Sequence, residues 1–93
     1  MSGERITRTV EVVNERGLHA RASAKLVKTA AQFQAEVSIV KDGMVVDAQS
    51  IMGLMMLAAG PGCCITVSAL GRDSAEAVAA VVDLVARRFD EDR

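Results

Sequence analysis

Aromatic residues are almost absent from this 93-residue sequence. It contains no Trp, no Tyr and two Phe, Phe33 and Phe89. Neither sign of charge dominates, because 11 basic and 12 acidic side chains give a formal net charge of −1. Proteins that bind single-stranded nucleic acids use aromatic side chains to stack on bases and a basic groove to hold the phosphates. We therefore expect no nucleic-acid partner.

Cysteine is also scarce. The two cysteines, Cys63 and Cys64, are adjacent, and neighbouring residues of a strand point to opposite faces, so an unstrained disulfide between them is not expected. One histidine and two adjacent cysteines do not provide the ligand spacing of a zinc or copper site. We predict reduced thiols, no metal and no cofactor. A metal-carrying, ferredoxin-like module built on these cysteines is a remote alternative.

Long uninterrupted hydrophobic runs are missing as well. Residues 1–13 carry charges where an export signal needs an apolar centre. Residues 48–71 carry no charge, but the Gly-Pro-Gly sequence at 60–62 divides them into two pieces that are each too short to span a bilayer. We expect a cytoplasmic protein with no membrane insertion.

The residues that are present predict one domain over residues 1–93. Hydrophobic residues make up 51% and charged residues 25% of the chain, a balance typical of globular proteins. Alternating apolar and polar residues predict a strand over 6–13, and apolar residues at helical spacing predict a helix over 20–33. Asp42-Gly43 is a favoured hairpin turn between two further short strands within 35–48.

The second half of the chain predicts three more elements. Ser50 can cap a short helix from Ile51 to about Ala58, and a strand follows over 63–69. Asp73 and Glu76 form a potential capping box for a last helix. The apolar stripe of that helix comprises Val78, Val81, Val82, Val85 and Phe89. The order β-α-β-β-α-β-α favours an antiparallel sheet covered on one face by helices, an α+β two-layer sandwich.

The only histidine lies in the segment GLHARAS, residues 17–23, at the start of the first predicted helix. A helix N-terminus presents unpaired backbone N–H groups and the positive end of the helix dipole, which together favour phosphate binding. At this position the imidazolium form of His19 is disfavoured, so a ring nitrogen keeps its lone pair, and an attached phosphoryl group is stabilised. Arg21 could add a charge-assisted hydrogen bond, and Gly17 allows the loop to bend closely before the helix.

These residues alone leave a simpler interpretation open. A single histidine near a helix start is usually a surface residue, and Arg21 could pair with a carboxylate. The sequence places no carboxylate near His19, so it does not assemble a Ser-His-Asp triad or another acid–base site.

Two segments carry a family resemblance. Residues 17–33, GLHARASAKLVKTAAQF, are similar to the active-site segment of HPr, the histidine-containing phosphocarrier family of the phosphoenolpyruvate-dependent sugar phosphotransferase system. Residues 48–62, AQSIMGLMMLAAGPG, resemble the segment around that family's regulatory serine, and the ending RFDED resembles the family's nitrogen-branch paralogue. The resemblance implies an HPr-like open-faced sandwich, in which four antiparallel strands have the order 1-4-2-3 and three helices cover one face.

The same resemblance implies a carrier rather than an independent enzyme. Such a protein accepts a phosphoryl group from phosphorylated enzyme I on Nδ1 of His19 and passes it to a histidine of an enzyme IIA-type domain, and Arg21 matches the arginine that steadies the group. The alternative is a regulatory binding module of a nitrogen-type or carbon-control branch, which acts through its phosphorylation state rather than through sugar uptake. We expect a monomer, because successive partners dock on one face.

The second motif implies regulation and docking. Ser50 matches the serine that a dedicated HPr kinase/phosphorylase modifies in some bacteria, while a plain helix cap is the alternative. Ile51, Met52 and Met55 are predicted to point away from the face that carries Leu54. The resemblance implies that these three side chains dock partners, for which adaptable methionines are suited.

One position departs from the family. Proline usually follows the arginine directly, whereas this chain has Ala22 there, in a first helical turn that begins with Ala20. We expect a slightly looser turn with one more free N–H near the phosphoryl group. That difference affects the rate of transfer and the lifetime of phosphohistidine more than the role of His19.

Overall fold

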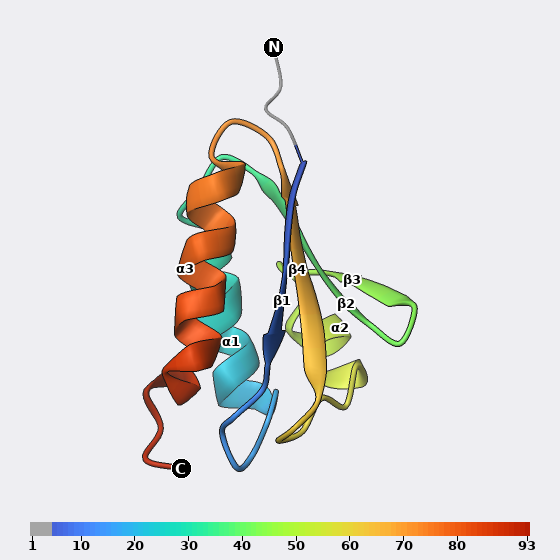
Figure 1. Cartoon of the computed structure of the whole chain (residues 1–93), viewed down its shortest axis with the longest axis vertical. Coiled ribbons are helices and arrows are strands. Elements are labelled where there is room, and N and C mark those ends of the chain that lie inside the picture. Colours follow the sequence, from blue (N-terminus) through green and yellow to red (C-terminus); the bar gives the residue numbers. More distant parts are fainter. Residues whose placement is uncertain (1–4) are drawn as a thin grey trace.

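Four strands, three helices and a short 3₁₀ turn lie along residues 5–93, which are the residues that the computed structural model describes (Figure 1). The elements are β1 Arg5–Glu11, α1 Ala20–Ala30, β2 Glu36–Lys41, β3 Met44–Asp47, α2 Ile51–Met56, β4 Cys64–Leu70, α3 Ser74–Ala86 and a 3₁₀ turn Arg88–Asp90. This is the predicted order β-α-β-β-α-β-α. The first four residues of the predicted domain 1–93 lie outside the described residues. Within 5–93, no helix combines the length and apolarity needed to cross a membrane.

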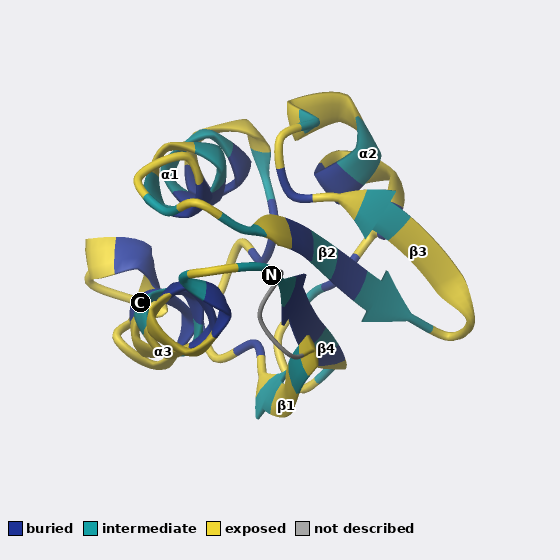
Figure 2. Cartoon of the chain, turned by 90° about the horizontal axis from the view of Figure 1, so that it is seen from above, coloured by how far each residue is buried: buried dark blue, intermediate teal, exposed yellow. Residues whose placement is uncertain are grey.

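The strands form one antiparallel sheet in the order β1-β4-β2-β3. β4 pairs with β1 on one side and with β2 on the other, and β2 and β3 form a hairpin. Figure 2 shows the helices gathered on one side of this sheet. The predicted α+β sandwich, its strand order and its helical cover are therefore confirmed.

The core lies between the sheet and the helices. On β4, Ile65, Val67 and Ala69 are fully buried at every second position, as the two-residue period of a strand requires. Leu26 of α1 and Val81 of α3 are also fully buried and belong to the same hydrophobic cluster. The helix α1 is therefore packed into the core.

The hairpin turn between β2 and β3 has the predicted form. Asp42 and Gly43 have φ angles of 51° and 82°, and Lys41 pairs with Met44 on either side of them. Two successive residues with positive φ are what a type I′ hairpin turn requires, and an Asp-Gly pair favours it.

The first helix is shorter than predicted, and the predicted capping box is wrong. α1 ends at Ala30 rather than Phe33, and the Asp73 side chain does not cap α3. Instead, the Gln34 N–H donates to the Asp73 carboxylate at 2.8 Å, and the Asp73 N–H donates to the Gln34 carbonyl at 3.0 Å. These two bonds join the loop after α1 to the loop before α3. The Asp73 carboxylate, which the local pattern assigned to a helix cap, is therefore used in a tertiary contact instead.

Two strand boundaries also differ from the prediction at turns. β1 ends at Glu11 rather than Val13, and β4 begins at Cys64 rather than Cys63. The Cys63 N–H donates to the Gly60 carbonyl at 3.1 Å, which closes a turn just before the strand. The two cysteines are free thiols, with Cys64 exposed and Cys63 partly buried.

Two helices end earlier than predicted, because residues with left-handed backbone follow them. α2 ends at Met56 rather than near Ala58, because Ala58 has a φ of 51°, which a right-handed helix cannot continue through. α3 ends at Ala86, and Phe89 lies in the following 3₁₀ turn with a φ of 53°. Phe89 is nevertheless fully buried. The apolar stripe was therefore predicted correctly, whereas the end of the helix was not.

Candidate functional site

His19 is the N-cap residue of α1, as predicted. Its backbone is extended, with φ −73° and ψ −179°, and its carbonyl accepts the Ser23 N–H at 2.9 Å. The ring nitrogen Nδ1 accepts a hydrogen bond from the Arg21 N–H at 3.3 Å. A ring nitrogen that accepts a hydrogen bond carries a lone pair and no hydrogen. Nδ1 is therefore the unprotonated nitrogen, and it lies at the positive end of the helix.

The other ring nitrogen has a carboxylate partner that sequence reasoning missed. Nε2 of His19 lies 2.5 Å from Oε2 of Glu91, which is 72 residues further along the chain. Because Nδ1 is the acceptor, Nε2 carries the hydrogen and donates it to Glu91. The sequence places no carboxylate near His19, and the tertiary structure supplies one. The acidic ending of the sequence contains Glu91, but no spacing rule connects it with residue 19.

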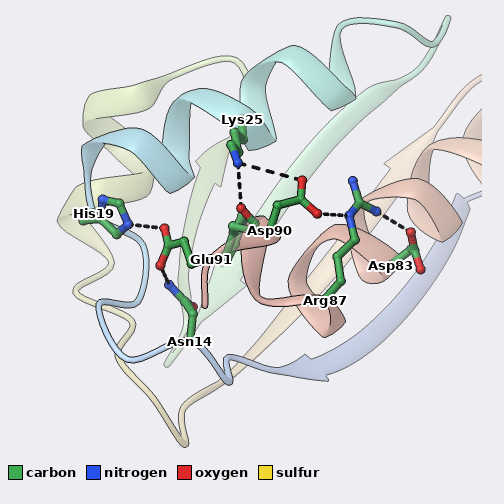
Figure 3. A network of polar contacts seen from close by, with 8 residues as sticks. Asn14, His19, Lys25, Asp83, Arg87, Asp90 and Glu91 are labelled. Atoms are coloured by element: carbon green, nitrogen blue, oxygen red, sulfur yellow. Dashed lines mark hydrogen bonds and ion pairs between the residues drawn. The ribbon is translucent and has the colours of Figure 1, made fainter. Parts of the chain in front are cut away.

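Asn14 orients Glu91. Its Nδ2 donates to Oε1 of Glu91 at 3.0 Å (Figure 3). The same Nδ2 donates to the Gly17 carbonyl at 2.9 Å, and the Asn14 side chain is fully buried. Burial raises the pKa of Glu91, but the hydrogen bonds from Asn14 and His19, together with electrostatic attraction to His19 and Arg16, outweigh it. The pKa of Glu91 is therefore lowered from its ordinary value of 4.5, and its carboxylate is ionised at neutral pH.

The C-terminal segment, residues 88–93, is held across the start of α1 at several points. Lys25 Nζ donates to the Phe89 carbonyl at 2.7 Å and lies 3.8 Å from a carboxylate oxygen of Asp90 (Figure 3). The Glu15 N–H donates to the Arg93 carbonyl at 3.0 Å. With the buried Phe89 ring, these contacts bring Glu91 to His19.

Charged side chains of both signs line an open hollow of about 430 Å³ beside His19. The lining residues are Glu15, Arg16, His19, Arg21, Lys25, Asp90, Glu91, Asp92 and Arg93. The Arg21 guanidinium is exposed and makes no hydrogen bond or ion pair with another residue of 5–93. It lines the hollow, so an anion there would not have to compete with a partner of Arg21 from residues 5–93.

The residues around His19 that were singled out from the sequence have distinct positions. Gly17 has a φ of +62°, and a Cβ built on it would lie 2.2 Å from the Ala59 carbonyl oxygen. The predicted close bend at this glycine is confirmed. Ala20, the first residue of α1, is exposed, whereas Ala22 is fully buried. Residue 22 therefore faces the core while residues 20 and 21 face solvent.

The second predicted motif forms a separate surface on α2. The Ser50 Oγ accepts the Gly53 N–H at 2.9 Å, which confirms Ser50 as the N-cap. Ile51, Met52 and Met55 are exposed, as predicted, and Met56 joins them, with exposed fractions from 41% to 73%. These four side chains, here called the methionine surface, line a second hollow of about 510 Å³. The sequence pattern missed Met56.

The described part of the chain contains no candidate metal centre. Within residues 5–93, no three His, Cys, Asp or Glu side chains are grouped so that they could hold a metal ion.

Comparison with known proteins identifies the family. The family described as "PTS HPr component phosphorylation site" matches residues 6–87. The chain belongs to the HPr family. Among HPr relatives, a phosphocarrier protein HPr from Cupriavidus necator is 48% identical over 86 residues, covering 92% of this chain and 97% of the relative. A phosphocarrier protein NPr from Shewanella violacea is 41% identical, covering 94% and 96%.

Solved HPr structures have the same fold. A crystal structure of HPr from Thermoanaerobacter tengcongensis superposes with a TM-score of 0.90 at 41% identity, covering 95% of this chain and 99% of that one. The HPr family match ends at residue 87. His19, Arg21 and the methionine surface thus lie inside the matched segment, whereas Phe89 and Glu91 lie beyond it.

Proposed function

We propose that this chain is a phosphocarrier of the phosphotransferase system that accepts a phosphoryl group on Nδ1 of His19 from phosphorylated enzyme I and donates it to an enzyme IIA-type domain. The observation that carries the proposal is the position of Nδ1. In a chain of the HPr family, this unprotonated nitrogen lies at the N-terminus of α1, where backbone N–H groups favour an attached phosphate.

The chemistry follows from that position. The Nδ1 lone pair attacks phosphorus and forms the new N–P bond, while the bond between phosphorus and the donor breaks and its electrons leave with the donor. The group that arrives carries negative charge, which the first turn of α1 stabilises through its N–H groups and dipole. The unpartnered guanidinium of Arg21 is close enough in sequence to add a charge-assisted hydrogen bond. The reverse exchange passes the group to the acceptor.

The methionine surface is proposed as the docking surface for both partners. Its four side chains are exposed, whereas Leu54 of the same helix is fully buried and holds α2 to the core. Flexible methionines can adapt to more than one partner. We propose that the protein docks as a monomer and acts in the cytoplasm, where these partners reside.

The test of transfer is a phosphorylation assay with phosphoenolpyruvate and enzyme I. The native protein should gain one acid-labile phosphoryl group, and His19→Ala should gain none. Ser50→Ala serves as the matched control, because it removes the other N-cap side chain and should be labelled normally. Equal labelling of His19→Ala and the native protein would refute the proposal.

The docking surface is tested separately. Met52→Lys should raise the KM of enzyme I for this carrier, while Met44→Lys, at an exposed methionine outside α2, should leave it unchanged. An identical KM for native and Met52→Lys protein would exclude Met52 from the docking surface.

A second candidate function is regulatory binding controlled at Ser50. The observation that favours it is the position of Ser50, which directly precedes Ile51, the first residue of the methionine surface. A phosphate placed there by an HPr kinase/phosphorylase would add negative charge beside an apolar docking surface and change which partners bind. Capture of partners by native, His19→Ala and Ser50→Asp proteins tests this candidate, which fails if all three capture the same partners equally.

A further inference from the structure

The C-terminal segment brings to His19 a group that lies beyond the family match. We propose that Glu91 is a positioning residue for phosphoryl transfer: it holds His19 in the tautomer with hydrogen on Nε2, and so presents Nδ1 as the nucleophile. This inference rests on the proposed carrier function. It adds a residue four positions past the last residue of the match at 87.

The two ring nitrogens have partners that require the same tautomer. A neutral imidazole carries one hydrogen, on either Nδ1 or Nε2. At Nδ1 the partner is the Arg21 N–H, a donor, at 3.3 Å. At Nε2 the partner is the Glu91 carboxylate, an acceptor, at 2.5 Å. Moving the hydrogen to Nδ1 would place two donors against each other at one nitrogen and two acceptors at the other.

The two contacts are unequal in strength. The N–H···Nδ1 bond is long for a hydrogen bond, whereas the contact to Glu91 is short and involves an ionised acceptor. Among the charged side chains that line the hollow within residues 5–93, Glu91 is the one that hydrogen-bonds the ring. The carboxylate is therefore the main determinant of the tautomer.

The same carboxylate matches the charge that transfer creates on the ring. When Nδ1 forms a bond to phosphorus and Nε2 keeps its hydrogen, the imidazole ring becomes formally cationic. A carboxylate hydrogen-bonded to that N–H stabilises the cation, as the aspartate of a Ser-His-Asp triad does for its histidine. Glu91 thus favours both the nucleophilic form and the phosphorylated form.

The position of Glu91 is well determined by its surroundings. The buried Asn14 amide donates to its second oxygen, so the carboxylate plane is held from two sides (Figure 3). Phe89, two residues earlier, is fully buried, and Lys25 bonds its carbonyl. Three successive residues, Arg88, Phe89 and Asp90, have φ angles of 62°, 53° and 63°. Residues with side chains adopt this backbone at a cost, which the surrounding contacts here offset.

The experiment compares Glu91→Ala and Glu91→Gln with Glu76→Gln as the control, because Glu76 is an exposed carboxylate of α3 that does not line the hollow beside His19. Nitrogen-15 NMR of the imidazole reports which nitrogen carries the hydrogen. We expect the Nε2–H form to predominate in the native protein and in Glu76→Gln, and to lose population in Glu91→Ala. Glu91→Gln should restore much of it, since its amide oxygen can accept from Nε2.

Phosphorylation rates give the second readout. Glu91→Ala should be phosphorylated on the order of tenfold more slowly, the lower range seen when a carboxylate that orients a metal-binding histidine is removed. Glu91→Gln should recover only part of that rate, because it restores the hydrogen bond without the charge. Glu76→Gln should match the native rate.

An unchanged tautomer population in Glu91→Ala would overturn the inference, as would an unchanged rate. Neither result would affect the proposed function, which depends on His19 itself. The NMR measurement needs no phosphoryl donor, so it tests Glu91 even if the native protein takes no label.

Discussion

α1 and α2 begin in the same way and differ in what surrounds their first residues. Each helix starts after a side chain that accepts a backbone N–H: His19 Nδ1 from Arg21 at 3.3 Å and Ser50 Oγ from Gly53 at 2.9 Å. Charged groups from three parts of the chain surround His19, whereas exposed isoleucine and methionine side chains follow Ser50. The same local capping geometry thus accompanies two different surfaces.

The difference teaches that capping geometry alone does not determine function. Around His19, an ionised Glu91 and an Arg21 side chain without a partner in residues 5–93 suit the proposed role of His19, whose charge would change as a phosphoryl group arrives and leaves. Around Ser50, flexible apolar side chains suit contact with another protein. The two surfaces are also connected, because the Leu18 N–H donates to the Ala59 carbonyl at 3.0 Å in the loop after α2.

The largest effect is expected for a substitution that should change the surroundings of His19 and leave the methionine surface unchanged. Phe89→Ala should lower the free energy of unfolding by about 3–5 kcal/mol, because it leaves a cavity where a fully buried ring lies. It should also release Glu91 from His19 and leave the methionine surface unaffected. Urea unfolding gives the stability, and NMR shifts of α2 report on the second surface. Stability within about 1 kcal/mol of the native protein would show that Phe89 does not hold the C-terminal segment.

A smaller effect is expected where the two surfaces meet. Gly17→Ala should destabilise the fold by about 1–3 kcal/mol, because residue 17 has positive φ and the new Cβ would overlap the Ala59 carbonyl. Relief of that overlap should shift both the His19 loop and the loop after α2. Thermal unfolding and chemical-shift mapping measure the two consequences. Gly43→Ala is the control, since it also has positive φ but its Cβ would meet no atom within 4 Å.

Loss of the α2 cap comes next. Ser50→Ala should cost about 1 kcal/mol of unfolding free energy, because the Gly53 N–H loses its acceptor. The effect should be confined to α2 and leave His19 labelling unchanged. Met52→Ala, at an exposed position of the same helix, should change stability by no more than about 0.5 kcal/mol. Equal denaturant midpoints for the two variants would contradict a stabilising cap.

The smallest effect is expected at acid pH. The pKa of Glu91 is lowered in the folded protein, so its carboxylate contributes stability that is fully present above about 4.5 and is lost as the pH falls through the lowered value. The stability difference between the native protein and Glu91→Gln should therefore be larger at pH 7 than at pH 3. Urea unfolding at both pH values measures it, and a difference that grows on acidification would contradict the assigned direction.

Most of the fold could be predicted because its signals are local. Two-residue alternation marked the strands, helical spacing marked the helices, and Asp42-Gly43 marked the hairpin turn correctly. The errors lie at element ends. Asp73 was assigned to a helix cap, but its carboxylate accepts the Gln34 N–H instead. Which N–H this carboxylate accepts depends on a loop 39 residues away.

The candidate site likewise has one part that the sequence predicts and one part that it does not. The GLHARAS segment places His19 at a helix N-terminus, and the Nδ1 contact there involves a residue only two positions away. Glu91 could not be predicted, because its approach depends on Phe89 packing in the core, on three left-handed residues and on Asn14. No pattern in the sequence encodes the resulting distance.

The sequence by itself determined the fold class, the histidine at a helix start and the exposed apolar surface after Ser50, since each follows from periodicity or capping between neighbouring residues. The tertiary structure alone brought a carboxylate to the other ring nitrogen of His19, Nε2. That contact joins residues 72 positions apart, and only packing of the whole chain brings groups so distant in sequence within hydrogen-bonding distance.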